Sequence, residues 1–173
     1  MINNISLFFI FFGGCMSWTI ALGEFLEHKK QTFNYIFAVF MFCVGSVQLI
    51  NGIIISGRID YYPYIAYLHL PFLASLGPTF YFCYKSVIGA KYQFKWYSFL
   101  HGMPVLLITL GLIYYFNINP EIKTLSIMTP PSFISGVTKI FYYSLLFIVV
   151  VLVVLGYMVY FLIECSSMFT LRF

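Results

Sequence analysis

The stretch "TKIFYYSLLFIVVVLVVLGYMVYFLI", residues 138–163, is apolar along almost its whole length. A helix of this stretch is about 39 Å long at 1.5 Å per residue, which exceeds the roughly 30 Å hydrocarbon core of a bilayer. An apolar run of this length predicts a membrane-spanning helix that tilts or projects from the bilayer. The chain is therefore expected to be an integral membrane protein.

Four earlier runs also reach spanning length, namely residues 5–26, 33–56, 64–84 and 98–116. These runs are too long for the roughly 9 to 11 residue strands of a membrane barrel, and their backbone groups have to pair within each segment. Hydrophobic residues make up 62% and charged residues 8% of the chain, against about 25% charged residues in a typical globular domain. We therefore predict an all-α polytopic membrane helix bundle with five transmembrane helices, forming one integral membrane domain over residues 1–173 without a soluble domain.

The basic residues are unequally divided between the two ends of the predicted spans. Six lie on the side of the first loop, the third loop and the C-terminus, namely Lys29, Lys30, Lys85, Lys91, Lys95 and Arg172. Three lie on the opposite side, namely Arg58, Lys123 and Lys139. Because Lys and Arg accumulate in cytoplasmic loops, this distribution predicts an external N-terminus and a cytoplasmic C-terminus.

Two histidines lie in or near the spans, and a pair of imidazoles in a membrane protein raises the question of a metal site. His69 follows the start of the third predicted span and His101 the start of the fourth, so they lie near opposite membrane faces. Their separation in depth is roughly 15 to 20 Å at 1.5 Å per residue, too far to share a metal ion. Each ring is instead expected to hydrogen-bond a neighbouring helix. We predict no metal site and no cofactor.

Polar and small residues mark two helix faces. Gln48 and Asn51 are spaced i and i+3 in the second span, so they share one face as interhelical contacts or as one wall of a small polar pocket. In the first span Gly13, Ser17 and Ala21 repeat at i+4, a spacing that lets helix backbones approach closely. This second face predicts packing within the bundle or between protomers.

Catalytic motifs are lacking in the sequence. There is no HExxH motif, no phosphate-binding glycine loop and no Ser/His/Asp set at a common depth. We therefore expect that the protein is not an enzyme.

The third run contains unusual interruptions for a helix in lipid. Pro71 and Pro78 each remove a backbone donor, and Gly77 leaves room at a bend around "LASLGP", residues 73–78. Carbonyls freed by proline need neighbours in lipid, which predicts that this helix lies inside the bundle. A hinge at Gly77-Pro78 would pass movement into the basic loop Lys85–Lys95, and the alternative is a static kink that only improves packing.

The stretches "LHLPFLASLGPTFYFCYKSVIG", residues 68–89, and "FKWYSFLHGMPVLLITL", residues 94–110, together resemble the membrane region of bacterial membrane-bound AraC-type transcriptional regulators. In that family a helix ending in a Gly-Pro, aromatic, Tyr pattern leads through a short basic loop to a helix that opens with Leu-His, a spacer and Pro. The matching positions here are Gly77, Pro78, Tyr81, Tyr84, Lys85, Leu100, His101 and Pro104. The resemblance is clearest over residues 61–116.

The resemblance implies an anchor or sensor in the bacterial cytoplasmic (inner) membrane, placed ahead of a cytoplasmic helix-turn-helix domain. It gives six structural or hinge candidates: Gly77, Pro78, Pro71, His69, His101 and Pro104. Family members continue into further spans and a DNA-binding domain, so the resemblance implies a truncated or frame-shifted copy, or a fragment. No residue here is expected to bind nucleic acid, and no ligand is indicated.

The expected partner is the lipid bilayer, and a homo-oligomer formed through membrane helices is a further option. Two alternatives to an anchor or sensor remain at this point. One is a small transport or channel-like subunit with its path along the second and third helices, and the other is a structural membrane partner protein. A transport function would predict an intramembrane carboxylate or a second broken helix, and neither is visible in the sequence.

Overall fold

The computed structural model describes residues 4–27, 31–58, 63–88, 96–118 and 133–170, which are almost entirely helical. The elements are α1 Asn4–Leu26, α2 Thr32–Ile55, α3 Pro63–Ile88, the 3₁₀ helix η2 Trp96–Gly102, α4 Met103–Ile118 and α5 Phe133–Thr170. No strand occurs within these described ranges. The predicted all-α class is therefore confirmed.

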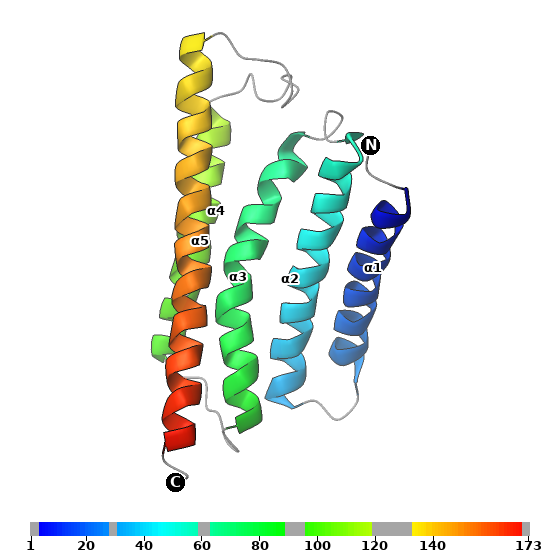
Figure 1. Ribbon diagram of the computed structural model, residues 1–173, viewed down its shortest axis with the longest axis vertical. Helices are drawn as coiled ribbons and strands as arrows, with labels where there is room; N and C mark the ends of the chain where they lie inside the picture. The colour runs from blue at the N-terminus through cyan, green and yellow to red at the C-terminus, as the bar shows by residue number, and fades with distance from the viewer. Residues whose placement is uncertain (1–3, 28–30, 59–62, 89–95, 119–132, 171–173) are drawn as a thin grey trace.

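The helices form an open arrangement with α3 at its centre. Figure 1 shows α1, α2 and α3 side by side, with α4 and α5 on the far side of α3. Helix α3 packs against α2, α4, α5 and η2, whereas α1 packs on α2. The prediction that the interrupted third helix lies inside the bundle is thus confirmed. The N-terminal ends of α1, α3 and α5 all point to one end of the molecule (Figure 1).

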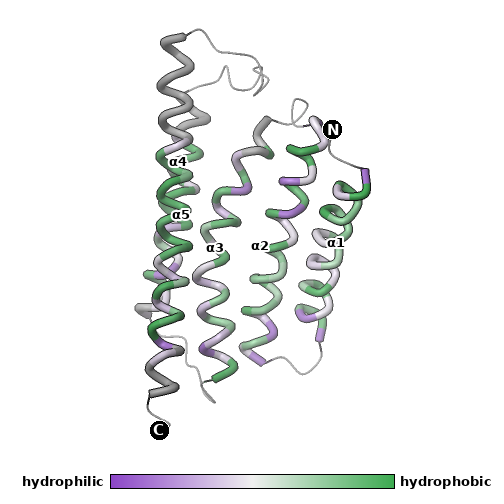
Figure 2. Tube along the Cα trace, in the orientation of Figure 1, coloured by the Kyte–Doolittle hydropathy of each residue, from purple (hydrophilic) through white to green (hydrophobic). Residues whose placement is uncertain are grey.

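Within the residues that the structure describes, three helical segments are long and apolar enough to cross a membrane, namely Asn4–Leu26, Thr32–Ile55 and Ser144–Glu164. The apolar part of the fourth helix, Ser98–Tyr114, is shorter. Figure 2 shows the difference in hydropathy: the middle of α5 is strongly hydrophobic, whereas α3 is paler because it carries Pro, Ser, Tyr and His. Length and hydropathy therefore support a membrane-embedded protein.

The fourth and fifth helices differ from their predicted bounds. The predicted span 98–116 is divided into η2 and α4 at Met103. Pro104 has no N–H to donate to the carbonyl of Leu100, so a regular α-helix cannot include both residues without losing this hydrogen bond. Proline is, however, favoured in the first turn of a helix, which is its position in α4. Helix α5 extends beyond 138–163 at both ends and is about 57 Å long at 1.5 Å per residue. Hydropathy marks only its apolar middle.

Glycines bring α1 and α2 into close contact. A Cβ on Gly14 would lie 2.7 Å from Leu49 Cγ and 3.2 Å from the carbonyl oxygen of Gly45. A Cβ on Gly45 would meet the Trp18 ring and lie 2.8 Å from the carbonyl oxygen of Gly14. The Trp18 ring stacks on Phe42 at 5.4 Å, and its Nε1 donates to Ser46 Oγ at 3.3 Å. The two backbones approach closely because neither glycine carries a side chain.

Replacing Gly14 with alanine is expected to destabilise the α1–α2 pair by about 1 to 2 kcal/mol, because the added methyl overlaps Leu49. Gly23→Ala is the matched control, since a Cβ on Gly23 meets nothing within 4 Å. The measurement is the free energy of unfolding of the purified chain in detergent micelles. Equal stability of both variants would show that α1 and α2 do not pack through Gly14.

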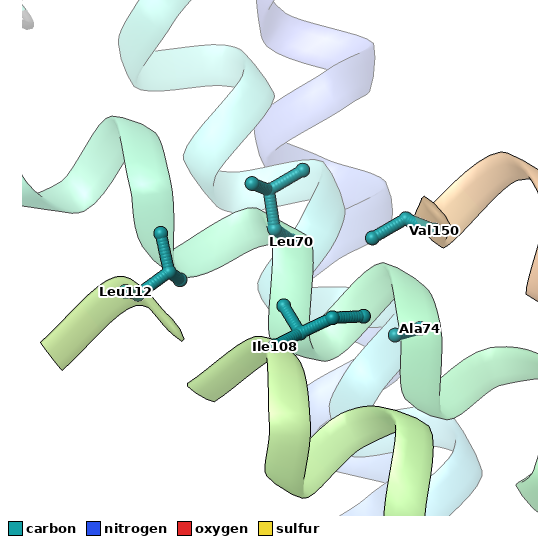
Figure 3. Close-up of a cluster of buried hydrophobic side chains, with 5 residues drawn as sticks. All are labelled: Leu70, Ala74, Ile108, Leu112 and Val150. Atoms are coloured by element: carbon teal, nitrogen blue, oxygen red, sulfur yellow. The ribbon is translucent and has the colours of Figure 1, made fainter. Parts of the chain in front are cut away.

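A small apolar core joins α3, α4 and α5. It consists of Leu70 and Ala74 from α3, Ile108 and Leu112 from α4, and Val150 from α5 (Figure 3). Val150 is the buried residue that α5 contributes to this core, and large apolar side chains are exposed along much of its apolar segment. Lipid tails are as apolar as these side chains, so apolar burial alone gives little preference for one position of α5 against α3.

Candidate functional site

Polar and aromatic side chains gather where the C-terminal parts of α3 and α5 meet η2. We call this group the polar cluster: Tyr81 and Lys85 from α3, His101 from η2, and Tyr157 and Glu164 from α5. Figure 1 places the C-terminal ends of α3 and α5 at the same end of the molecule. The cluster therefore connects three separate elements at one end of the bundle.

A hydrogen bond joins η2 to α5 inside the polar cluster. His101 Nδ1 lies 2.5 Å from the hydroxyl oxygen of Tyr157. When Nε2 carries the ring proton, the Tyr157 hydroxyl donates to Nδ1, and the roles reverse in the other tautomer. The sequence analysis predicts that His101 hydrogen-bonds to a neighbouring helix. In the structure its partner is Tyr157 of α5.

Aromatic contacts hold the His101 ring against α3. Its centroid lies 5.2 Å from that of Tyr81 and 5.3 Å from that of Phe82. The Tyr81 ring also lies 6.2 Å from Tyr157 and 5.5 Å from Tyr160. Ring pairs at such separations add about 0.5 to 1.5 kcal/mol beyond their buried area. Tyr81 thus contacts both η2 and α5.

An ion pair joins α3 directly to α5. Lys85 Nζ donates to Glu164 Oε1, and the two side chains are 30% and 20% exposed. Lys85 Nζ also lies 5.8 Å from the centre of the Tyr81 ring, within cation–π range. Because both charged groups are largely removed from solvent, removing either one would leave its partner poorly compensated.

Gly77 provides the space that Tyr157 occupies. A Cβ at position 77 would lie 2.8 Å from Tyr157 Cδ2 and 3.1 Å from Tyr157 Cβ. The second contact is with the base of the side chain, which cannot move away without moving α5. The glycine of the Gly-Pro pair therefore has a specific packing role, because it allows the Tyr157 ring to lie against α3.

The polar cluster fixes the register of α5 along α3, that is, which residues of the two helices lie opposite each other. Tyr157 and Glu164 are spaced i and i+7, and Tyr81 and Lys85 are spaced i and i+4, so each pair lies on one helix face. A shift of α5 by one turn, about 5.4 Å, would separate Tyr157 from His101 and Glu164 from Lys85 at once. The contacts His101–Tyr157 and Lys85–Glu164 are consequently satisfied together in this one register.

The two span prolines lie within a continuous helix. Pro71 and Pro78 are inside α3, which runs from Pro63 to Ile88, and Figure 1 shows it curving along its length. Side-chain hydroxyls satisfy nearby carbonyls: Ser75 Oγ donates to Pro71 O at 2.7 Å, and Thr79 Oγ1 donates to Ser75 O at 2.7 Å. The hinge at Gly77-Pro78 stays a prediction, and most of the loop Lys85–Lys95 lies outside the described residues.

The remaining hinge candidates lie apart from one another. His69 is in the second turn of α3, whereas His101 contacts Tyr81, about 18 Å further along that helix. The structure thus does not bring the two imidazoles together. Pro104 is in the first turn of α4, where its missing N–H has no helical partner to lose.

The polar pair of α2 is divided by the structure. Gln48 faces α1, where its buried Oε1 lies 2.9 Å from the position of a Cβ on Gly13. Asn51 differs from the expectation of a contact within the bundle, because its side chain is exposed. Residues i and i+3 differ by a net rotation of about 60° around a helix, and on α2 this difference leaves Asn51 exposed while Gln48 lies against α1. The structure therefore buries the Gln48 Oε1 against α1, without a hydrogen-bond partner among the described residues, and leaves Asn51 exposed.

The small-residue face of α1 is directed toward α2. Ser17 and Ala21 are buried, and Gly13 lies beneath the end of the Gln48 side chain. Ser17 Oγ donates to the carbonyl oxygen of Gly13 at 2.9 Å, which satisfies this hydroxyl within α1. The three residues therefore pack within the bundle.

Sequence reasoning missed Tyr157 and Glu164, although one signal was available. The predicted spans end at residues 84 and 163, and the predicted topology puts both ends on the same side of the membrane. Lys85 and Glu164 directly follow those ends, so opposite charges were to be expected at one depth. No comparable signal identifies Tyr157, because neither hydropathy nor spacing indicates which helix packs against Gly77.

The polar cluster connects its three helical elements through a hydrogen bond, an ion pair and ring contacts. In the part of the chain that the structure describes, no three His, Cys, Asp or Glu side chains are grouped to hold a metal ion. The interactions that the polar cluster can make and break include the His101–Tyr157 hydrogen bond and the Lys85–Glu164 ion pair.

Comparison of the chain with protein families, with curated proteins and with solved structures found no match.

Proposed function

We propose that the chain is the membrane-embedded anchor and sensor region of a signalling protein, in which α5 transmits a change in its position against α3. The polar cluster is the observation that supports this function. It holds α5 in place through Tyr157 and Glu164, which lie in the C-terminal part of that helix. A stimulus that breaks these contacts would release that end of the helix.

The weak apolar packing of α5 favours this mechanism. Its apolar segment is largely exposed, and Val150 is its contribution to the small core. Two arrangements of such a helix differ little in apolar packing energy when lipid covers the faces that are exposed. The ion pair and the hydrogen bond then decide between the arrangements, as a two-state switch requires.

The topology belongs to the same proposal. All five long helices cross the cytoplasmic membrane of a bacterium, η2 and α4 together form the fourth crossing, and the C-terminus is cytoplasmic. The bias of Lys and Arg toward one side supports this orientation. The resemblance to AraC-type membrane regulators supports a signalling role, and no DNA contact is assigned to any residue of this chain.

Transport is the less favoured function. The partly buried carboxylate of Glu164 lies at the last residue of the apolar segment Ser144–Glu164, and it is paired with Lys85. Ion-coupling sites of transporters lie near the bilayer midplane. The position of this ion pair therefore favours an anchor that is held at one end.

A reporter fused after Phe173 is expected to lie in the cytoplasm, because most basic residues flank that side. Fusions of alkaline phosphatase and of green fluorescent protein at this position form a matched pair, since the first is active only outside and the second only inside. A fusion after residue 128 should give the opposite pattern. An active phosphatase after Phe173 would overturn the proposed orientation.

The signalling role is tested by fusing the whole chain to a cytoplasmic DNA-binding reporter domain whose output requires dimerisation. Lys85→Glu, which places two like charges in the polar cluster, is expected to change reporter output several-fold at equal membrane levels. Val87→Glu is the control, because Val87 is exposed near the same end of α3. Equal output from the wild type and both variants would identify a static anchor and contradict the sensor role.

A further inference from the structure

A second site lies at the opposite end of the bundle from the polar cluster. A cavity of about 760 Å³ opens between the start of α1, the end of α2 and the start of α3. Both α1 and α2 are long and apolar enough to cross a membrane, so this cavity lies where their ends reach the lipid headgroups. Its volume is within the range of about 300 to 1,000 Å³ that is usual for ligand sites.

The deeper part of the cavity is apolar. Leu7 and Phe11 line it from α1, Ile53 from α2 and Ile65 from α3. Phe11 lies about 10 Å further along α1 than Asn4, which is the first residue of that helix. A ligand that fills this space therefore has an apolar portion extending along the helices.

The outer part of the cavity is polar and carries a positive charge. Asn4, Ser56 and Arg58 line it, and all three lie at helix ends. Ser56 Oγ donates to Ile53 O at 2.8 Å, and Gly57 adopts φ of 73°, which ends α2 and places Arg58 beyond it. Within the described residues no carboxylate forms an ion pair with Arg58. Arg58 is also exposed, so its guanidinium can reach an anion at this position.

The simplest role for Arg58 is to stabilise the C-terminal end of α2, where a positive charge is favourable. That role does not account for the cavity. The end of α2 contributes roughly half a negative charge, whereas the starts of α1 and α3 each contribute roughly half a positive charge. The helix ends together add to the full positive charge of Arg58, which favours an anion at this site.

We infer that this cavity binds one anionic phospholipid, with its phosphate on Arg58 and an acyl chain along Leu7, Phe11 and Ile65. The charge of the outer part and the apolar deeper part match the two portions of such a molecule. Guanidinium is the side-chain group that best fits phosphate oxygens, through paired N–H donors. A free phosphate ion would leave the apolar portion of the cavity empty. This site is independent of the signalling role proposed above.

The experiment titrates the purified full chain, delipidated in neutral detergent, with phosphatidylglycerol and follows the midpoint of thermal unfolding. Phosphatidylglycerol is expected to raise the midpoint, and phosphatidylcholine and inorganic phosphate at equal concentrations are not. Arg58→Gln should weaken the apparent affinity for phosphatidylglycerol by at least on the order of tenfold, since it removes the charge-assisted hydrogen bonds to the phosphate. Arg58→Lys should retain part of the affinity.

Arg172→Gln is the matched control, because it also removes one positive charge, but near the C-terminal end of the sequence and far along the chain from Arg58. It is expected to bind phosphatidylglycerol as the wild type does. Three results would overturn the inference: unchanged affinity in Arg58→Gln, an equal loss in Arg172→Gln, or equal stabilisation by inorganic phosphate. The first would remove Arg58 from the site, the second would indicate non-specific charge attraction, and the third would replace the lipid by a free anion.

Discussion

Glu164→Lys is expected to separate the C-terminal part of α5 from α3 and to lower the free energy of unfolding by about 2 to 4 kcal/mol. The substitution places a second ammonium group beside Lys85, where both side chains are largely removed from solvent. Breaking a fully buried pair costs about 3 to 5 kcal/mol and a surface pair contributes about 0 to 1, so a partly buried pair lies between these limits. Unfolding in mixed detergent micelles measures the change.

The reciprocal substitution makes this prediction specific to the ion pair. Lys85→Glu alone should destabilise by a similar amount, because it places two carboxylates together. The double variant Lys85→Glu with Glu164→Lys should recover more than half of the loss, since opposite charges again face each other. Ser166→Lys adds a charge at an exposed position of the same helix and is expected to change stability little. A double variant as unstable as the singles would show that the two residues do not interact.

Gly77→Ala is expected to displace Tyr157 from α3 and to cost about 2 to 4 kcal/mol, through overpacking and the loss of a hydrogen bond. The added methyl would lie 2.8 to 3.1 Å from Cδ2, Cγ and Cβ of Tyr157. Because these atoms lie close to the α5 backbone, the helix has to move with them. The His101–Tyr157 hydrogen bond is then lengthened or lost.

Gly156→Ala is the matched control, because Gly156 precedes Tyr157 and a Cβ there meets nothing within 4 Å. It should leave stability unchanged or slightly higher, as alanine favours helix more than glycine does. Ring ¹⁵N NMR signals of His101 report its hydrogen bond directly and should change in Gly77→Ala alone. Unchanged stability together with unchanged His101 signals would show that Tyr157 does not occupy the space beside Gly77.

The sequence predicts the first two helices well, because their apolar runs end where the helices end. The runs 5–26 and 33–56 differ by one residue at each start and by at most one at each end from α1 and α2. Helix α5 is longer than its apolar run, since a helix outside hydrocarbon need not be apolar. The division at Met103 depends on the backbone effect of Pro104, which a hydropathy pattern does not include.

The candidate site is only partly accessible from the sequence. Gly77, Lys85 and His101 stand out there because they interrupt or flank apolar runs. Their partner Tyr157 does not, since fifteen tyrosines are present and the neighbour of a helix face is set by tertiary packing. Asn51 is the converse case, because the sequence pattern predicts a contact there and the structure has this polar side chain exposed.

The central claim is that the polar cluster holds α5 against α3 in one register, and cross-linking in membranes tests it most directly. The rings of Tyr84 and Phe161 lie 4.8 Å apart, next to the cluster but outside it. Cysteines at these two positions, in a chain whose native cysteines are replaced by serine, report the register through a short bifunctional maleimide. We predict rapid cross-linking with the intact cluster, at least several-fold slower cross-linking with Lys85→Glu, and recovery in the charge-swapped double variant. Equal rates in all three chains would contradict the account.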